Sequence, residues 1–361
     1  MPKLPIRRVL KWLFIGLGVV LAGVVATPLG RYILRAGWEE AKILSRRKPI
    51  EAVIANPATD PALKERLRLV LEARAYALDT LGLEAGESFT TFAQLDRDTL
   101  VLVLSAAHRD RLAAYRWWFP IVGRLPYKGF FDPADARRAR DDFQARGFDT
   151  YLRPASAFST LGWFNDPLLS TTVRGDTTWL VNTVIHELSH NTLFVAGNAE
   201  FSESFASFIG ARGAGAFFRS RNAPLAAEAV DEDWANDQVF GSFWEHVARS
   251  LDSAYRAWPN DSAARVAARD SVYARARIAL VDSVGPKLRG INPSYLSRIP
   301  LDNASLLARR VYAQRLDLFD SVWVRNDRDV RRTIAAVQSV VRDSGDPFAA
   351  LERLIRVEKV P

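Results

Sequence analysis

The stretch TVIHELSHNTLFVAGNAEFSESFASF, residues 183–208, holds two of the four histidines in a chain of 361 residues. His186 and His190 are four positions apart, and Glu187 directly follows the first of them. Apolar spacing predicts a helix over residues 178–196, on which the two histidines share one face. The stretch therefore predicts either a metal site or a surface helix that carries two histidines by chance.

The chemistry of this spacing favours the metal site. Two neutral imidazoles at i and i+4 can bind one divalent ion, with Zn–N distances of about 2.0–2.1 Å. Glu187 lies about 100° further around the helix, at a poor angle for joining both histidines as a ligand. It can instead reach a metal-bound water and take its proton, as the HExxH pattern requires. We therefore expect one Zn²⁺ ion, with Glu187 as the general base.

A catalytic zinc ion also needs a third protein ligand and an open position for water. The long metzincin motif requires glycine and histidine where this chain has Leu193 and Ala196, so that class is excluded. The nearest carboxylates are Glu203 and Glu200, and a distant histidine, His108 or His246, is a further alternative.

Glu203 is the favoured third ligand. A turn at residues 197–198 lets the chain fold back, so that a second helix can pack on the first. Ala206 and Ser207 are small enough to let the two helices approach closely. The sequence thus predicts Glu203 as a ligand beside the two histidines.

The N-terminus predicts a membrane segment. MPKLPIRRVLK is basic, and WLFIGLGVVLAGVVATPLG (12–30) is an uncharged, mostly apolar run. At about 19 residues this run is just long enough for a transmembrane helix. We expect residues 1–30 to form a membrane anchor, with a cleaved signal peptide as the alternative. A short basic tail before a single span predicts a periplasmic or otherwise extracytoplasmic body.

The rest of the chain predicts an α+β fold. Residues 31–198 mix strand and helix patterns and form an α+β lobe that ends in the HExxH helix. Residues 199–361 are helical almost throughout and form a helical lobe that supplies the third metal ligand. We expect one helix over 303–323, and an edge strand over 167–173 that could pair with an extended peptide. A catalytic cleft would lie between the lobes.

Composition limits the alternatives. The net charge is +8, but the basic residues are interleaved with acids, as in ARRARDDFQAR (136–146) and RNDRDVRR (325–332). Such mixed runs are typical of solvated helix faces, so we expect no nucleic-acid partner. The chain has no cysteine, which excludes disulfides, Cys-ligated zinc and thiolate catalysis.

Several stretches of the sequence, the HExxH stretch among them, resemble a known bacterial family. STLGWFNDPLLST (159–171), HELSHNTLFVAGN (186–198) and FSESFASF (201–208) are closely similar to a bacterial family of predicted aminopeptidases. WWFPIVGRLPYKGFF (117–131) and RIPLDNASLLARRVYAQRLDLFDSV (298–322) also resemble it, so the similarity spans most of the chain after the membrane segment.

The resemblance implies a zincin-like metalloprotease lobe of the gluzincin type. It implies His186, His190 and Glu203 as zinc ligands and Glu187 as the general base. Many members of the family carry a lipid-attachment cysteine after the signal. This chain has none, so a transmembrane anchor would replace it. The spacing from His190 to Glu203 is also shorter than in thermolysin-like enzymes, so their substrate sites cannot be carried over.

These observations predict a zinc-dependent peptidase that acts on peptide substrates, and the family label implies an aminopeptidase. One alternative is a non-catalytic zinc-containing interaction module on a membrane anchor, against which the intact Glu187 argues. Another is a metallohydrolase of other amide bonds, such as those of cell-wall peptides. A group that stabilises the oxyanion should come from across the cleft, and Tyr127, His246 and Tyr312 are the candidates.

Overall fold

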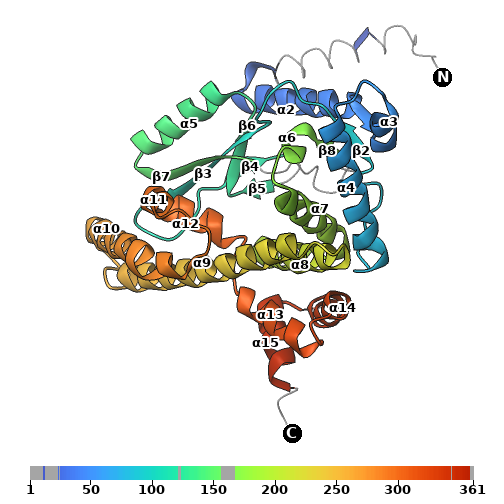
Figure 1. Cartoon of the computed structure of the whole chain (residues 1–361). Coiled ribbons are helices and arrows are strands. Elements are labelled where there is room, and N and C mark those ends of the chain that lie inside the picture. Colours follow the sequence, from blue (N-terminus) through green and yellow to red (C-terminus); the bar gives the residue numbers. More distant parts are fainter. Residues whose placement is uncertain are drawn as a thin grey trace, which may run out of the picture.

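The computed structural model describes residues 11, 12, 23, 25–120, 123–155, 167–342 and 344–357. Its strands all lie in the first half of the chain, and every regular element described after β8 is a helix (Figure 1). Most of the expected anchor, residues 1–30, lies outside the described residues. Among the helices that are described, none has the length and apolar character needed to cross a membrane.

One antiparallel sheet forms the centre of the strand-rich part. Its order is β6 (Tyr127–Phe130), β3 (Leu102–His108) and β7 (Phe148–Pro154). Helix α5 (Pro133–Ala145) covers one face, where Leu104 and Ala106 pack with Phe143. Because side chains alternate along a strand, the neighbouring residues of β3 point to the opposite face. That face is the one on which helix α12 (Asn303–Arg310) packs.

A second small sheet has the order β1 (Arg47–Pro49), β2 (Thr91–Ala93) and β8 (Leu168–Leu169), and β4 (Trp117–Phe119) pairs with β5 (Gly123–Leu125). The prediction of a strand over residues 167–173 is wrong about its length. Only two residues pair, and helix α6 (Ser170–Val173) follows at once. The hydroxyl of Ser170 accepts a hydrogen bond from the backbone N–H of Leu95. In a longer β8, a backbone carbonyl would accept this hydrogen bond instead.

The helical core surrounds α7 (Thr177–Thr192). Helix α4 (Pro61–Asp79), whose N-terminus is capped by Asp60, and α8 (Ala199–Ser220) pack against it. The largest hydrophobic cluster joins residues of these helices with residues of the C-terminal helices, such as Ile185, Phe205 and Phe319. The core is therefore continuous across the predicted lobe boundary at residues 198 and 199.

The other helices of the described chain are α2 (Pro28–Ser45), α3 (Ile50–Ala55), α9 (Pro224–Arg256), α10 (Ser262–Ala279), α11 (Pro293–Arg298), α13 (Leu316–Arg325), α14 (Val330–Val341) and α15 (Pro347–Val357). A π turn over Leu280–Val284 and a 3₁₀ turn over Gly285–Lys287 follow α10. The single helix expected over 303–323 is wrong, because the chain breaks between α12 and α13.

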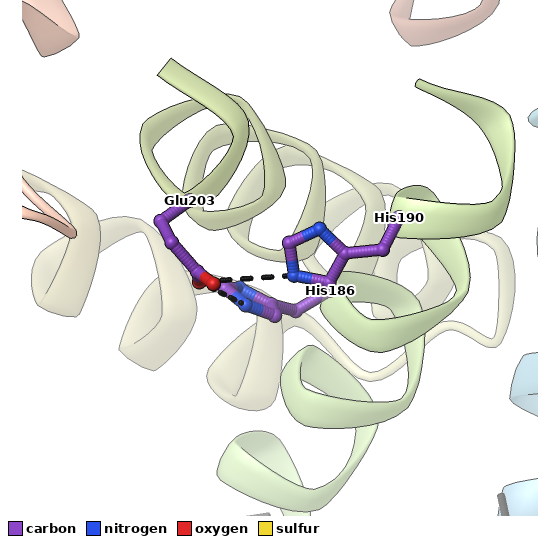
Figure 2. Close-up of side chains that lie close together, drawn as sticks. All are labelled: His186, His190 and Glu203. Carbon is purple, nitrogen blue, oxygen red and sulfur yellow. Dashed lines mark ion pairs between the residues drawn. The ribbon is translucent and has the colours of Figure 1, made fainter. Parts of the chain in front are cut away.

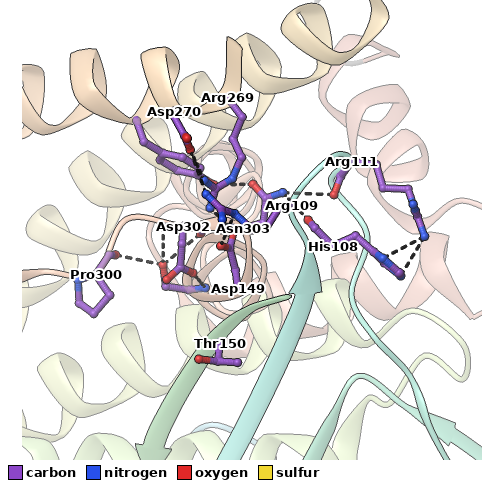
Figure 3. Close-up of polar contacts among 12 residues, drawn as sticks. His108, Arg109, Arg111, Asp149, Thr150, Arg269, Asp270, Pro300, Asp302 and Asn303 are labelled. Carbon is purple, nitrogen blue, oxygen red and sulfur yellow. Dashed lines mark hydrogen bonds and ion pairs between the residues drawn. The ribbon is translucent and has the colours of Figure 1, made fainter. Parts of the chain in front are cut away.

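A buried polar network fixes α12 to the sheet (Figure 3). Asn303 is completely buried, and its side-chain amide donates to the backbone oxygen of His108 at 2.7 Å and to that of Arg111 at 3.2 Å. Its backbone N–H donates to Asp149 on β7 at 3.0 Å, and Asp149 also pairs with the buried Arg269 of α10. The network holds the start of α12, and with it the turn that follows, in place over the sheet.

Candidate metal centre

Helix α7 begins and ends at defined residues. The carboxylate of Asp176 accepts a hydrogen bond from the backbone N–H of Thr178, as an N-cap does. The helix ends at Thr192 and not at residue 196 as expected. There the side chain of Gln338 donates to the Thr192 carbonyl at 3.0 Å, and the Thr192 hydroxyl accepts from the Glu84 backbone N–H. These tertiary contacts, which the local sequence does not reveal, hold the last turn.

Helix α8 turns back beside α7. Gly197 has a φ of +81°, a conformation that glycine adopts without strain, and Asn198 caps the new helix by accepting from the Phe201 N–H. The hydroxyl of Ser202 accepts from the Val195 N–H at 3.0 Å and closes the connecting loop. The reversal brings Glu203 opposite the histidine face of α7.

Figure 2 shows the result: two histidines from α7 and one carboxylate from α8 converge. Oε2 of Glu203 lies 3.3 Å from Nε2 of His186 and 3.7 Å from Nε2 of His190. One ligand atom from each residue lies within 4.8 Å of the other two. Ligands about 2.0–2.1 Å from a tetrahedral zinc ion are about 3.3–3.4 Å apart, so the donor set and its spacing fit zinc.

Close packing of the two helices makes this convergence possible. A Cβ at Gly210 of α8 would lie 2.5 Å from the side-chain oxygen of Asn182, 3.0 Å from its backbone oxygen and 3.1 Å from Cβ of His186. The small residue Ala206, expected at this contact, is completely buried. Only small side chains on α8 therefore allow Glu203 to reach the histidines.

The three side chains influence one another electrostatically. Burial lowers the pKa of His186, but its hydrogen bond with Glu203 and the charges of Glu187 and Glu203 outweigh burial and leave it raised. Burial and the neighbouring His186 lower the pKa of His190 to about 4. Burial would raise the pKa of Glu203, but the histidines and Arg153 lower it overall. Near neutral pH, His190 and Glu203 are therefore already in the protonation states that metal binding needs.

The alternative third ligands do not join this cluster. Glu200 is exposed in the first turn of α8, and His246 is exposed on α9. His108 lies at the end of β3, where its ring contacts Phe148 and Arg111. Among the described residues, these three form no metal-holding group with His186 and His190.

Two of the three oxyanion candidates lie near the cluster. The ring of Tyr312, in the turn between α12 and α13, is 6.5 Å from the ring of His186. Tyr127, at the start of β6, is close enough to Glu203 for that charge to raise its pKa, after the larger effect of burial. His246 has no such contact with the cluster among the described residues.

Arg153 on β7 is a member of the site that the sequence did not predict. Its guanidinium lies 5.9 Å from the centre of the Tyr312 ring and forms a hydrogen bond with the Tyr312 side chain. Its charge also lowers the pKa of Glu203. One arginine among many on a strand carries no local signal, so only the sheet register reveals it.

Glu187 is half-buried, and its charge acts on both His186 and Tyr312. Its carboxylate is therefore close enough to both side chains to raise the pKa of each. The carboxylate of Glu187, the ring of Tyr312 and the guanidinium of Arg153 are thus all near the ligand cluster.

Comparison with known protein families identifies the family of the chain. A family model described as Putative aminopeptidase matches residues 31–346. The chain belongs to this putative aminopeptidase family. The match includes the α7–α8 cluster, Arg153 and Tyr312, and family membership supports a peptidase function in general. No curated protein and no solved structure matches the chain.

Proposed function

We propose that this member of the putative aminopeptidase family is a zinc-dependent peptidase of the gluzincin type, with a zincin-like catalytic lobe. His186, His190 and Glu203 would hold one zinc ion, and Glu187 would act as the general base. The observation that carries the proposal is the approach of Glu203 to both histidine Nε2 atoms, at 3.3 and 3.7 Å. When bound there, zinc would supply Lewis acidity that polarises a peptide carbonyl and lowers the pKa of a water molecule.

The residues around the ligands supply the proton chemistry. Glu187 accepts a proton from the attacking water and passes it to the departing amine. It is suited to this because its carboxylate is close to His186 and Tyr312 without belonging to the ligand cluster. The Tyr312 hydroxyl donates a hydrogen bond to the negative oxygen that develops on the carbonyl. Arg153 holds this hydroxyl by a hydrogen bond.

The substrate class is a peptide, and the family description favours removal of N-terminal residues. We further propose that residues 1–30 anchor the chain in a membrane and that the body lies on the extracytoplasmic side. This rests on the basic tail and the apolar run of the sequence. A peptidase held there would act on peptides outside the cytoplasm.

Metal content and peptide hydrolysis, measured together on the full chain, test the proposal. The wild type should bind one zinc ion and cleave members of a mixed peptide library. Glu187→Gln should keep the zinc but lose at least about 100-fold in kcat, because the proton acceptor is gone. Glu200→Gln is the matched control on the exposed start of α8 and should match the wild type in both measurements.

Each other outcome assigns a different role to the cluster. Zinc binding without hydrolysis in any variant would support the structural-module alternative and overturn the peptidase. Cleavage of non-peptide amides alone would favour the other metallohydrolase. Failure of the wild type to bind metal would overturn the ligand set itself. Where peptides are cleaved, the positions of the cuts decide between an aminopeptidase and an endopeptidase.

A further inference from the structure

Helix α2 buries one side and exposes another that is largely apolar. Glu39 and Ile43 are only 5% and 2% exposed, whereas Leu34 and Trp38 are 43% and 68% exposed. Ala41 is also exposed. Because positions i, i+4 and i+7 share one face of a helix, Leu34, Trp38 and Ala41 form a continuous outward stripe. We call these three residues the outer stripe.

The charges of α2 are arranged unevenly around the outer stripe. By helical position, Arg31, Arg35 and Lys42 lie along one edge of it. Of the two acids, Glu39 is turned inward, where it accepts a hydrogen bond from Arg35 at 3.0 Å. Glu40 is only partly exposed and lies beyond the opposite edge. The outward face of α2 is therefore apolar with a basic edge, and no acid of the helix itself lies within it. At one end of this edge Lys42 lies 3.9 Å from the carboxylate of Asp96, which comes from outside the helix.

The position of α2 points to a bilayer as the occupant. The apolar run 12–30 leads directly into α2, so a membrane that holds this run lies next to the helix. In Figure 1, α2 lies at the end of the molecule away from α13–α15. A stripe one helix wide is also far smaller than the roughly 800 Å² per partner of a standard protein interface.

We propose that the outer stripe of α2 lies in the headgroup region of a membrane with anionic lipids. Leu34 and Trp38 enter the boundary between headgroups and acyl chains, where tryptophan is favoured. The basic edge, Arg31, Arg35 and Lys42, brings positive charge close to the lipid phosphates, which attract cations near the surface. The contact fixes the orientation of the body relative to the bilayer. It rests on the membrane anchor proposed for residues 1–30 but not on the peptidase chemistry. Loss of vesicle binding would mean that the anchor fails, whereas equal quenching of bound protein would mean that the outer stripe fails.

The lack of native cysteine makes a direct test possible in the full chain. In Leu34→Cys, a polarity-sensitive fluorophore reports from the outer stripe. Tyr295→Cys is the matched control, because Tyr295 is 49% exposed on α11 in the helical part of the chain. Both labelled proteins are reconstituted in vesicles of phosphatidylcholine, with and without phosphatidylglycerol. Spin-labelled lipid should quench the Leu34 probe at least about twofold more than the control, most strongly with the anionic lipid.

Adding Trp38→Glu to Leu34→Cys should abolish the extra quenching, since a carboxylate is repelled by the anionic surface. Trp38 is mostly exposed, so this change leaves the fold intact. Equal quenching of both probes in vesicle-bound protein would overturn the proposal. So would a Leu34 probe that becomes shielded only as protein concentration rises, because a second copy would then cover the stripe. Failure of the chain to bind either vesicle would overturn it as well.

Discussion

The ring of Tyr312 lies 6.5 Å from the ring of His186, although the two residues are far apart in the sequence. Burial raises the pKa of Tyr312 to about 12; the charges of Glu203 and Glu187 add to the rise, and Arg153 opposes it. The hydroxyl therefore keeps its proton at neutral pH. A protonated hydroxyl beside a metal-ligand candidate is suited to donate a hydrogen bond to a developing oxyanion.

Tyr312→Phe tests this role directly. We expect kcat for peptide cleavage to fall about 100-fold, the usual cost of removing one oxyanion donor, with KM and zinc content little changed. Tyr127→Phe is the matched control, since Tyr127 is also near Glu203 and similarly exposed. A large loss in the control and none in Tyr312→Phe would assign the donor to Tyr127.

The place of Tyr312 could not be predicted from the sequence. The segment 311–315, VYAQR, contains neither glycine nor proline, so its pattern predicts a continuous helix. The structure breaks there, with Arg315 at a φ of +51°. The backbone N–H of Gln314 donates to the Ser204 hydroxyl, and the Ala313 carbonyl packs against Gly241. Contacts with α8 and α9 thus override the local preference.

The ligand cluster shows the opposite case. His186 and His190 share a helix face by their spacing alone, and Glu203 follows after one turn, so local rules suffice to bring them together. Arg153 comes from a strand whose partner, β3, precedes it by about fifty residues. No local pattern links that strand to the histidines. The sequence therefore predicts the local half of the site and misses the half that depends on sheet register.

The contact at Gly210 predicts a coupling between packing and metal affinity. In Gly210→Ala the new Cβ would lie 3.0 Å from a backbone oxygen of α7 and 3.1 Å from Cβ of His186, so α7 must shift. We expect a loss of about 1–3 kcal/mol in the free energy of unfolding and weaker zinc binding. Urea denaturation and zinc titration measure the two effects.

Gly37→Ala is the control for this prediction, because Gly37 is helical and a Cβ there meets nothing within 4 Å. Alanine should be neutral or stabilise the protein by up to about 1 kcal/mol, through its better helix propensity. Unchanged stability and zinc affinity in Gly210→Ala would show that α7 and α8 can separate without disturbing His186.

Asn303 should be important for stability. It is completely buried, and its amide nitrogen donates to the backbone oxygens of His108 and Arg111. Its side-chain oxygen accepts from Tyr273 at 2.8 Å. Asn303→Ala leaves these buried groups without a partner, so we expect a loss of about 3 kcal/mol in urea denaturation. The exposed Asn260→Ala should change stability by less than about 0.5 kcal/mol. A similar small effect in both variants would contradict the importance of the network.

Asp237 on α9 predicts a pH dependence of stability. Asp237 is exposed by its surface area, but the protein packed around its carboxyl group raises the pKa of that group to about 7, and the charge of Asp233 adds to the rise. Below pH 3.8, the pKa of the group in the unfolded chain, the carboxyl group is protonated in both the folded and the unfolded protein, so it does not lower the free energy of unfolding. Between pH 3.8 and about 7, the carboxyl group of Asp237 loses its proton in the unfolded chain but keeps it in the folded protein. The wild type therefore loses stability as pH rises through this range. Asp237→Asn removes this loss, and its Tm should exceed that of the wild type at pH 8 but not at pH 4. Asp252→Asn, which makes the same change at an exposed position of the same helix, is the matched control. A Tm difference for Asp237→Asn that is the same at pH 4 and pH 8 would mean that Asp237 titrates as it does in the unfolded chain.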